Sequence, residues 1–81
     1  MRELTKVDIV KNRVDTIPQY YILDYLKKNL NIDEFKIYLV NRNSIKVIDS
    51  TGDYLYFNCD DNTREVTYEE KPKEKEYEIG L

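Results

Sequence analysis

The chain has 81 residues and a net charge of −3, with 36% charged and 41% hydrophobic residues. This length has room for one domain, and the hydrophobic fraction is typical of a folded domain rather than of a disordered chain. The mild negative charge gives no general attraction to nucleic acid. We therefore expect one small folded domain with a heavily charged surface.

The residue types that are missing exclude most catalytic and cofactor chemistries. The chain has no histidine, so imidazole cannot serve as a general base or a metal ligand. Cys59 is the only cysteine, which excludes an intramolecular disulfide and a thiolate zinc site. With Gly52 and Gly80 as the only glycines, no glycine-rich phosphate loop can form. We therefore expect no enzyme, no cofactor and no metal centre.

Four aspartates gather near the predicted turns, but their spacing does not match a calcium-binding loop, which needs a central glycine and a closing glutamate. Aspartate is an ordinary turn residue, and the turn interpretation is preferred over a metal site. These residues are Asp49, Asp53, Asp60 and Asp61.

The first fourteen residues fit two interpretations. Thr5 stands three residues before Asp8, which is the spacing of a helix N-cap. Val7 and Ile9 alternate with charged residues, and their β-branched side chains favour a strand. We predict a short helix near residues 5–13 and keep a short strand there as the alternative.

A second helix is predicted over residues 17–30. Thr16 and Gln19 have the spacing of a capping box, and Pro18 stands in the first turn, where its missing N–H removes no helical bond. Apolar residues at helical spacing predict the face that covers the core. They are Tyr21, Ile22, Tyr25, Leu26 and Leu30.

From residue 33 onward the apolar residues alternate with a period of two, which is typical of strands. Four runs, at 35–40, 44–48, 54–59 and 64–68, are separated by short clusters of turn residues. Connections this short cannot form the crossovers of a parallel sheet. The sequence therefore predicts an α+β fold: a helical N-terminal part on a three- to four-stranded antiparallel meander. Residues 1–68 would form the domain and 69–81 a charged tail, with an added edge strand at 77–81 as a further option.

The alternation divides the predicted strands into two faces. One face is apolar and should be covered by the helix at 17–30; it consists of Phe35, Ile37, Leu39, Ile45, Val47, Leu55, Phe57 and Cys59. The other face carries tyrosines among lysines; it consists of Lys36, Tyr38, Val40, Lys46, Ile48, Tyr54, Tyr56 and Asn58. If the last strand keeps the same register, Arg64, Val66 and Tyr68 join this second face.

The tyrosine and lysine face is the first candidate for function. Tyrosine gives a large contact area at low entropic cost, which suits a protein partner. Tyrosines among lysines could also stack bases, as in single-strand binders, and cross-strand pairs could simply stabilise a solvated face. We expect a protein partner through Lys36, Tyr38, Lys46, Tyr54 and Tyr56, with single-stranded nucleic acid as the alternative.

The acidic set of turns and tail is the second candidate surface, because carboxylates can stand in for phosphates before a nucleic-acid-binding enzyme. It consists of Asp49, Asp53, Asp60, Asp61, Glu65, Glu69 and Glu70. The sequence shows neither a signal peptide nor an apolar stretch long enough to span a membrane. We therefore expect a non-enzymatic cytoplasmic protein-binding module, such as an inhibitor or adaptor. The abundance of Lys, Asn, Ile and Tyr favours a phage or mobile element of a low-GC bacterium as its source.

Overall fold

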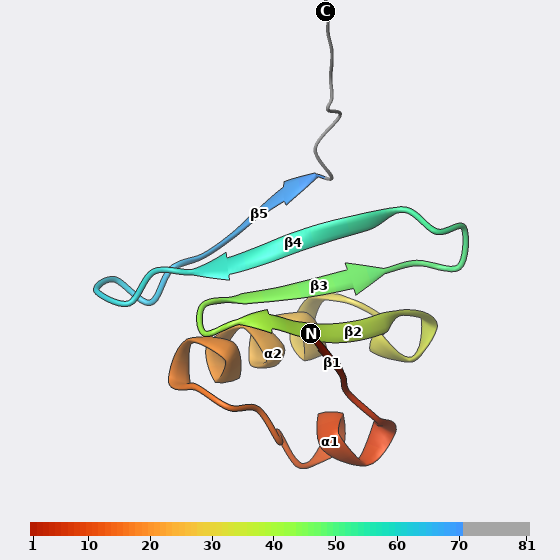
Figure 1. Cartoon of the computed structure of the whole chain (residues 1–81), viewed down its shortest axis with the longest axis horizontal. Helices are drawn as coiled ribbons and strands as arrows, with labels where there is room; N and C mark the ends of the chain where they lie inside the picture. The colour runs from red at the N-terminus through yellow and green to blue at the C-terminus, as the bar shows by residue number, and fades with distance from the viewer. Residues whose placement is uncertain (71–81) are drawn as a thin grey trace, which may run out of the picture.

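A computed structural model describes residues 1–70 of the chain. The α+β class predicted from the sequence is confirmed, although the sheet has five strands rather than three or four (Figure 1). The elements in chain order are β1 (Arg2–Glu3), α1 (Lys6–Val10), α2 (Ile17–Asn29), a 3-10 turn (Ile32–Glu34), β2 (Lys36–Asn41), β3 (Ser44–Ile48), β4 (Tyr54–Cys59) and β5 (Val66–Glu70).

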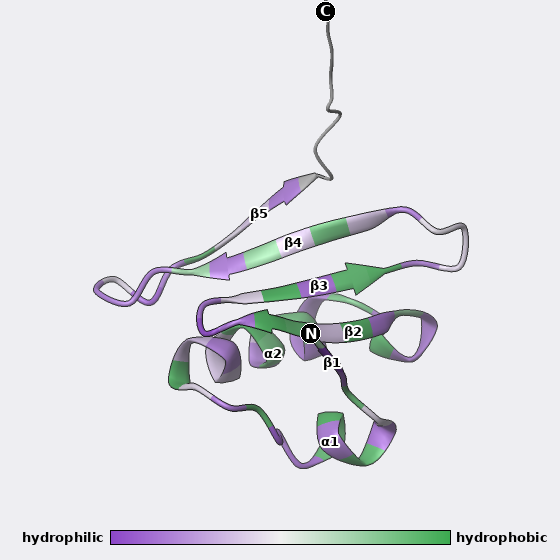
Figure 2. Ribbon diagram, in the orientation of Figure 1, coloured by the Kyte–Doolittle hydropathy of each residue, from purple (hydrophilic) through white to green (hydrophobic). Residues whose placement is uncertain are grey.

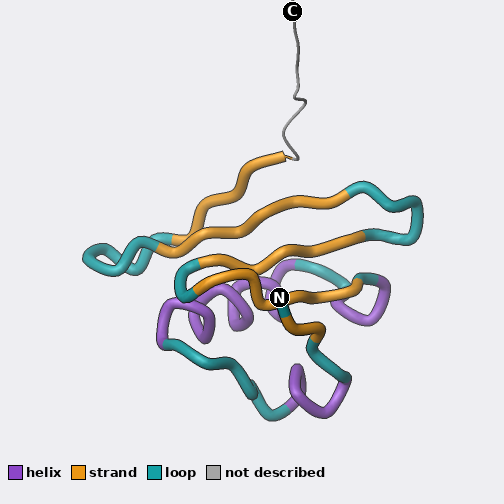
Figure 3. The backbone as a smooth tube through the Cα atoms, in the orientation of Figure 1, coloured by secondary structure: helices purple, strands orange, loops and turns teal. Residues whose placement is uncertain are grey.

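The five strands form one antiparallel sheet in the order β1-β2-β3-β4-β5, so the predicted meander is also confirmed. Figure 3 shows the sequential hairpin connections as loops at the ends of the strands. The additional strand is β1, which pairs with β2 through Arg2 opposite Leu39 and Glu3 opposite Tyr38. Two residues are too few to show an alternating pattern, which is why the sequence did not predict this strand.

In the segment near residues 5–13, the structure has the predicted helix rather than the alternative strand, and this helix, α1, covers Lys6–Val10. The Asp8 amide donates to the Thr5 hydroxyl over 3.1 Å, and the Thr5 amide donates to the Asp8 carboxylate over 3.0 Å. This reciprocal capping box satisfies two amides that the first helical turn cannot pair. The amide of Leu4, just before the cap, donates to the carbonyl of Ile37 over 2.8 Å and ties the entry of α1 to the sheet.

Helix α2 starts where the sequence predicts and ends one residue earlier, with Leu30 as its C-cap. Its Ile22, Leu23 and Leu26 side chains are fully buried against the sheet. Leu23 was not among the residues predicted for this face. Tyr25 was, but it lies at the border of the face and is 38% exposed.

The core lies between α2 and one face of the sheet, here called the inner face. Of the eight residues predicted for it, Ile37, Leu39, Ile45, Val47, Phe57 and Cys59 are buried, whereas Phe35 and Leu55 are half-buried at its margin. Figure 2 shows the corresponding alternation of hydrophobic and hydrophilic positions along the central strands. The predicted inner face of β2, β3 and β4 is therefore confirmed.

The last described strand, β5, runs to Glu70, two residues into the segment predicted as a charged tail. The edge strand suggested at 77–81 lies outside the described residues. Within residues 1–70, none of the helices is both long enough and apolar enough to cross a membrane.

Candidate functional site

The second face of the sheet, here called the open face, is covered by neither helix, because α2 and Ile9 of α1 pack on the inner face. Directly opposite residues of an antiparallel sheet lie on the same face. One row therefore crosses all five strands on the open face: Glu3, Tyr38, Lys46, Tyr56 and Glu69. A second row is formed by Lys36, Ile48 and Tyr54.

Two of the tyrosines on the open face pack on each other beside a lysine. The rings of Tyr54 and Tyr56 meet edge to face, with centroids 5.5 Å apart. The Lys46 Nζ lies 4.2 Å from the Tyr54 centroid and 5.8 Å from that of Tyr56. Cation–π contacts and aromatic pairs each stabilise such an arrangement by about 0.5–1.5 kcal/mol. The face is thus an ordered aromatic surface.

The open face carries charges of both signs. Lys36 and Lys46 provide two positive charges, and Glu3 and Glu69, at the two ends of the five-strand row, provide two negative charges. The Asn58 side-chain amide donates to the Glu69 carboxylate over 3.5 Å. The glutamates at both ends were not foreseen, because neither the pairing of β1 nor the register of β5 can be derived from one strand's own pattern.

The prediction that Arg64, Val66 and Tyr68 join this face is wrong. In the β4–β5 register, Val66 stands opposite Cys59 and Tyr68 opposite Phe57, so both lie on the inner side. Thr67 and Glu69 take the positions on the open face. Positions 60 and 65 are paired across the turn, and four residues connect them. Because this number is even, the open face receives the even-numbered residues of β4 but the odd-numbered residues of β5. Arg64 also leaves the extended conformation, with φ of 62°.

Asp60 and Asp61, two of the acidic candidates, do not lie among the tyrosines and lysines of the open face. They lie in the turn between β4 and β5, where the Asp60 carboxylate accepts the amides of Asn62 and Thr63 over 2.7 and 3.1 Å. The Asp61 carboxylate pairs with the Arg42 guanidinium over 2.7 Å. The hydrogen bond from Arg42 holds the pKa of Asp61 below its usual range. Both carboxylates are thus engaged in holding turns.

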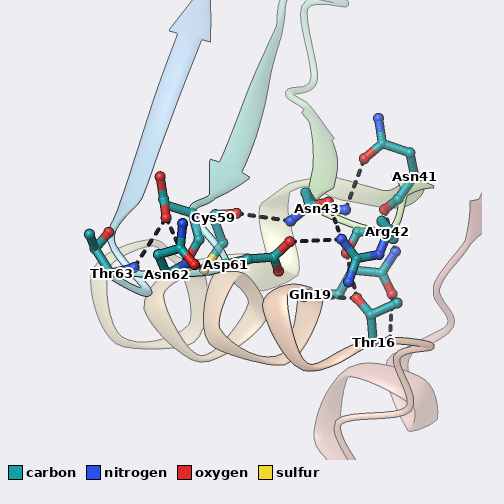
Figure 4. A network of polar contacts seen from close by, with 10 residues as sticks. Thr16, Gln19, Asn41, Arg42, Asn43, Cys59, Asp61, Asn62 and Thr63 are labelled. Atoms are coloured by element: carbon teal, nitrogen blue, oxygen red, sulfur yellow. Dashed lines mark hydrogen bonds and ion pairs between the residues drawn. The ribbon is translucent and has the colours of Figure 1, made fainter.

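A polar network ties three segments together at this end of the sheet (Figure 4). Thr16 donates to the carbonyl of Arg42 over 2.6 Å, and the buried Gln19 donates to that of Asn41, also over 2.6 Å. The Asn43 side chain donates to the carbonyl of Cys59 over 3.2 Å. The start of α2, the β2–β3 turn and the β4–β5 turn are therefore held as one unit.

Cys59 behaves as a core residue, as its pattern predicts. Its side chain is buried at the end of β4. Burial raises the pKa of the Cys59 thiol, and the nearby carboxylates of Asp61 and Asp60 raise it further. A thiol with a raised pKa is a poor nucleophile at neutral pH.

A second aromatic surface, which the sequence analysis missed, lies where α2 meets β5. The Tyr68 ring is 5.6 Å from the Phe57 ring, which is in turn 6.1 Å from that of Tyr25. The Arg64 guanidinium donates to the Tyr21 hydroxyl over 2.9 Å and lies 5.3 Å from its ring. Tyr68 is 59% exposed, so this aromatic edge is open to solvent. The alternation of Val66 and Tyr68 with Glu65, Thr67 and Glu69 is the signal that could have revealed it.

Two hollows lie on the surface of the described residues. A pocket of about 230 Å³ lies beside the start of α2 and contains the Arg42–Asp61 ion pair. This is below the roughly 300 Å³ typical of ligand pockets. An open hollow of about 410 Å³ beside β1 and β2 contains the Arg2–Asp15 ion pair, 3.2 Å long. The lining of the first hollow also includes Cys59, a thiol with a raised pKa, and Asp60, whose carboxylate accepts two turn amides.

Within residues 1–70, no group of three or more cysteine, aspartate or glutamate side chains is placed to hold a metal ion. Comparison with known proteins adds no functional information. No family model, curated protein or solved structure matches the chain significantly.

Proposed function

We propose that this chain is a non-catalytic protein-binding module and that the open face contacts its partner. One observation carries the proposal: Tyr38, Tyr54 and Tyr56 lie with Lys46 on a sheet face that neither helix covers. Interface hot spots are enriched in tyrosine, which contributes large area for few lost rotations.

The packing of this face supports binding without large rearrangement. Tyr38, Lys46, Tyr54 and Tyr56 are half-buried, so part of the entropic cost of ordering them is already met on folding. They project from adjacent hydrogen-bonded strands, which gives a rigid base. Rigid aromatic anchors surrounded by charged residues resemble the centre and rim of a protein interface.

Charge favours protein over single-stranded nucleic acid as the partner. A base-stacking surface also needs a positive track for the phosphates. Here Glu3 and Glu69 stand at both ends of the row that contains Lys46. Phosphates would meet these carboxylates, whereas a protein could pair with charges of either sign. We propose that the chain acts in the cytoplasm as an inhibitor or adaptor and is encoded by a phage or mobile element.

The proposal is tested by capture with matched variants. The double variant Tyr54→Ser/Tyr56→Ser removes two rings from the open face, and Tyr20→Ser removes an exposed ring of α2 as the control. Proteins captured from a low-GC bacterial lysate by the wild type and by Tyr20→Ser, but lost with the double variant, are the expected result. Capture that is equal for both variants contradicts the proposal.

A second arm tests nucleic acid directly. Purified protein is titrated with single-stranded oligonucleotides at low and high salt. We expect no binding in the micromolar range, because the face has no net positive charge. Binding that weakens steeply with salt and loses about 1–3 kcal/mol in Tyr54→Ala would replace the protein-binding proposal by the nucleic-acid one.

A further inference from the structure

The outer edge of β5 has backbone groups directed away from the sheet. Among the described residues β5 is the terminal strand and pairs only with β4. The Asp60 amide donates to the Glu65 carbonyl over 3.0 Å, so the backbone at position 65 faces β4. In an antiparallel pair such positions alternate. The N–H and C=O groups of Val66 and Tyr68 therefore point outward.

The bonding between β3 and β4 agrees with this assignment. The Cys59 amide donates to the Asn43 carbonyl over 3.0 Å, so Cys59 and, by alternation, Phe57 direct their backbone groups toward β3. Their partners across the β4–β5 ladder are Val66 and Tyr68. These two residues accordingly face away from β4.

The two sides of this edge differ in chemistry. On the inner side, Val66 is half-buried and Tyr68 extends the apolar surface from Phe57 into solvent. On the open side, Thr67 and Glu69 alternate with them, and the exposed Glu65 precedes the strand by one residue. Arg64 lies at the base of the strand but is directed to Tyr21 on the inner side. The edge is thus apolar on one side and acidic on the other.

The opposite edge of the sheet offers no comparable surface. Strand β1 has two residues, and its Arg2 forms ion pairs with Asp8 and Asp15 at 3.8 and 3.2 Å. Very short edge strands are poor templates for another chain. Strand β5, with five residues, is long enough for strand addition.

We propose that the β5 edge accepts a basic, extended segment of another protein as a sixth strand. An added antiparallel strand would bond to the outward groups of Val66 and Tyr68. Its residues opposite Glu69 and Glu65 would be lysine or arginine, and those opposite Tyr68 and Val66 would be apolar. The recognised pattern is basic, apolar, small polar, apolar, basic.

A second copy of this chain fits the edge less well. In the antiparallel register that sets Val66 opposite Tyr68 of the other copy, Glu65 stands opposite Glu69 in both halves of the pairing. Like charges directly opposite each other destabilise a sheet. A basic strand converts both repulsions into attractive pairs, and charge therefore selects a basic partner over self-association.

This site adjoins the open face and shares Glu69 with it, but it is formed by the strand edge rather than by the tyrosines, and its test needs no natural partner. The probe is a short synthetic peptide with the central sequence Lys-Val-Thr-Val-Lys, and the matched control is Glu-Val-Thr-Val-Glu. Each is titrated into the isotopically labelled full chain, and the backbone amides are followed by NMR. We expect the Val66 and Tyr68 amides to shift and to become protected from hydrogen exchange. The lysine peptide should bind about fivefold to tenfold more tightly than the glutamate peptide.

Methylated peptides test the backbone geometry. Methylation of both valine nitrogens removes the N–H groups that face β5 and should abolish binding. Methylation of the threonine nitrogen, which faces away from β5, should preserve it. Equal loss with both peptides would overturn strand addition.

A charge reversal tests the acidic side of the edge. Glu65 and Glu69 are exposed, and circular dichroism of Glu65→Lys/Glu69→Lys checks that the variant folds. This variant should prefer the glutamate peptide. An unchanged preference, shifts confined to the open face, or a wild-type dimer that occupies the β5 edge and excludes the peptide would each overturn the proposal.

Discussion

The two faces of the sheet are built from alternate residues of the same strands, yet their environments differ. On β3, Ile45 is fully buried beneath α2, whereas its neighbour Lys46 lies over the Tyr54 ring on the open face. Both environments are ordered, but only one excludes water. Stability should therefore depend mainly on the inner face.

The largest expected effect comes from the inner face. Ile45→Ala should lower the free energy of unfolding by about 2–5 kcal/mol, because it leaves a cavity in a core with little room to relax. Lys46→Ala, one residue away, should cost about 1 kcal/mol or less. Urea denaturation of both variants measures the difference. Similar losses would show that the two faces are buried alike.

The next effect sharpens the comparison at β5. Val66→Ala removes methyl groups from the inner side and should cost about 1 kcal/mol, whereas Thr67→Ala on the open side should change stability by less than about 0.5 kcal/mol. The same urea experiment applies. A larger loss for Thr67→Ala would assign β5 to the opposite register.

This register shows what the sequence could and could not predict. The inner faces of β2, β3 and β4 follow from their own alternation, because Ile37, Leu39, Ile45, Val47 and Phe57 occupy every second position of their strands and are buried. The register of one strand against the next depends on the turn that joins them. The sequence indicates the geometry of a turn less clearly than it indicates the alternation within a strand. The irregularity between Leu39 and Asn41 is one example, since it shifts the register by one residue beside the two-residue turn at 42–43.

The candidate site, like the fold, was predicted correctly within the strands of clear alternation but not across the turns. Lys36, Tyr38, Lys46, Tyr54 and Tyr56 do share a face, because they belong to the strands with clear alternation. The partnership of Asp61 with Arg42 joins residues 19 positions apart and leaves no local pattern. The aromatic edge at Tyr68 was misplaced because the extrapolation across the β4–β5 turn kept the wrong alternation.

A smaller effect is expected from the contact between Lys46 and Tyr54. A double-mutant cycle with Lys46→Met and Tyr54→Leu keeps the apolar bulk and removes the charge and the ring in turn. The coupling free energy should be about 0.5–1 kcal/mol in favour of the wild-type pair. Thermal or urea unfolding of the four proteins supplies the cycle. A coupling of zero would mean that the lysine is held by its neighbours without attraction to the ring.

The smallest expected effect concerns the turn that sets β4 in register with β3. The Asp49 carboxylate accepts the Thr51 hydroxyl over 2.7 Å and the amides of Thr51 and Asp53 over 2.9 and 3.1 Å. These bonds, the Thr51 hydroxyl first, hold the pKa of Asp49 below its usual value of 3.8. Because the folded-state pKa is the lower one, this carboxylate stabilises the fold fully above pH 3.8 and loses that contribution as pH falls through the folded value.

The variant Asp49→Asn cannot titrate at this position, so its unfolding midpoint should fall less between about pH 5 and pH 2.5 than that of the wild type. Above pH 5 it should be the less stable protein, because an amide accepts the three turn bonds more weakly than a carboxylate. The two midpoints should therefore approach each other as the solution is acidified. Parallel curves over this range would show that the Asp49 turn contributes nothing to acid sensitivity, and that the register of the open face is held by the strands alone.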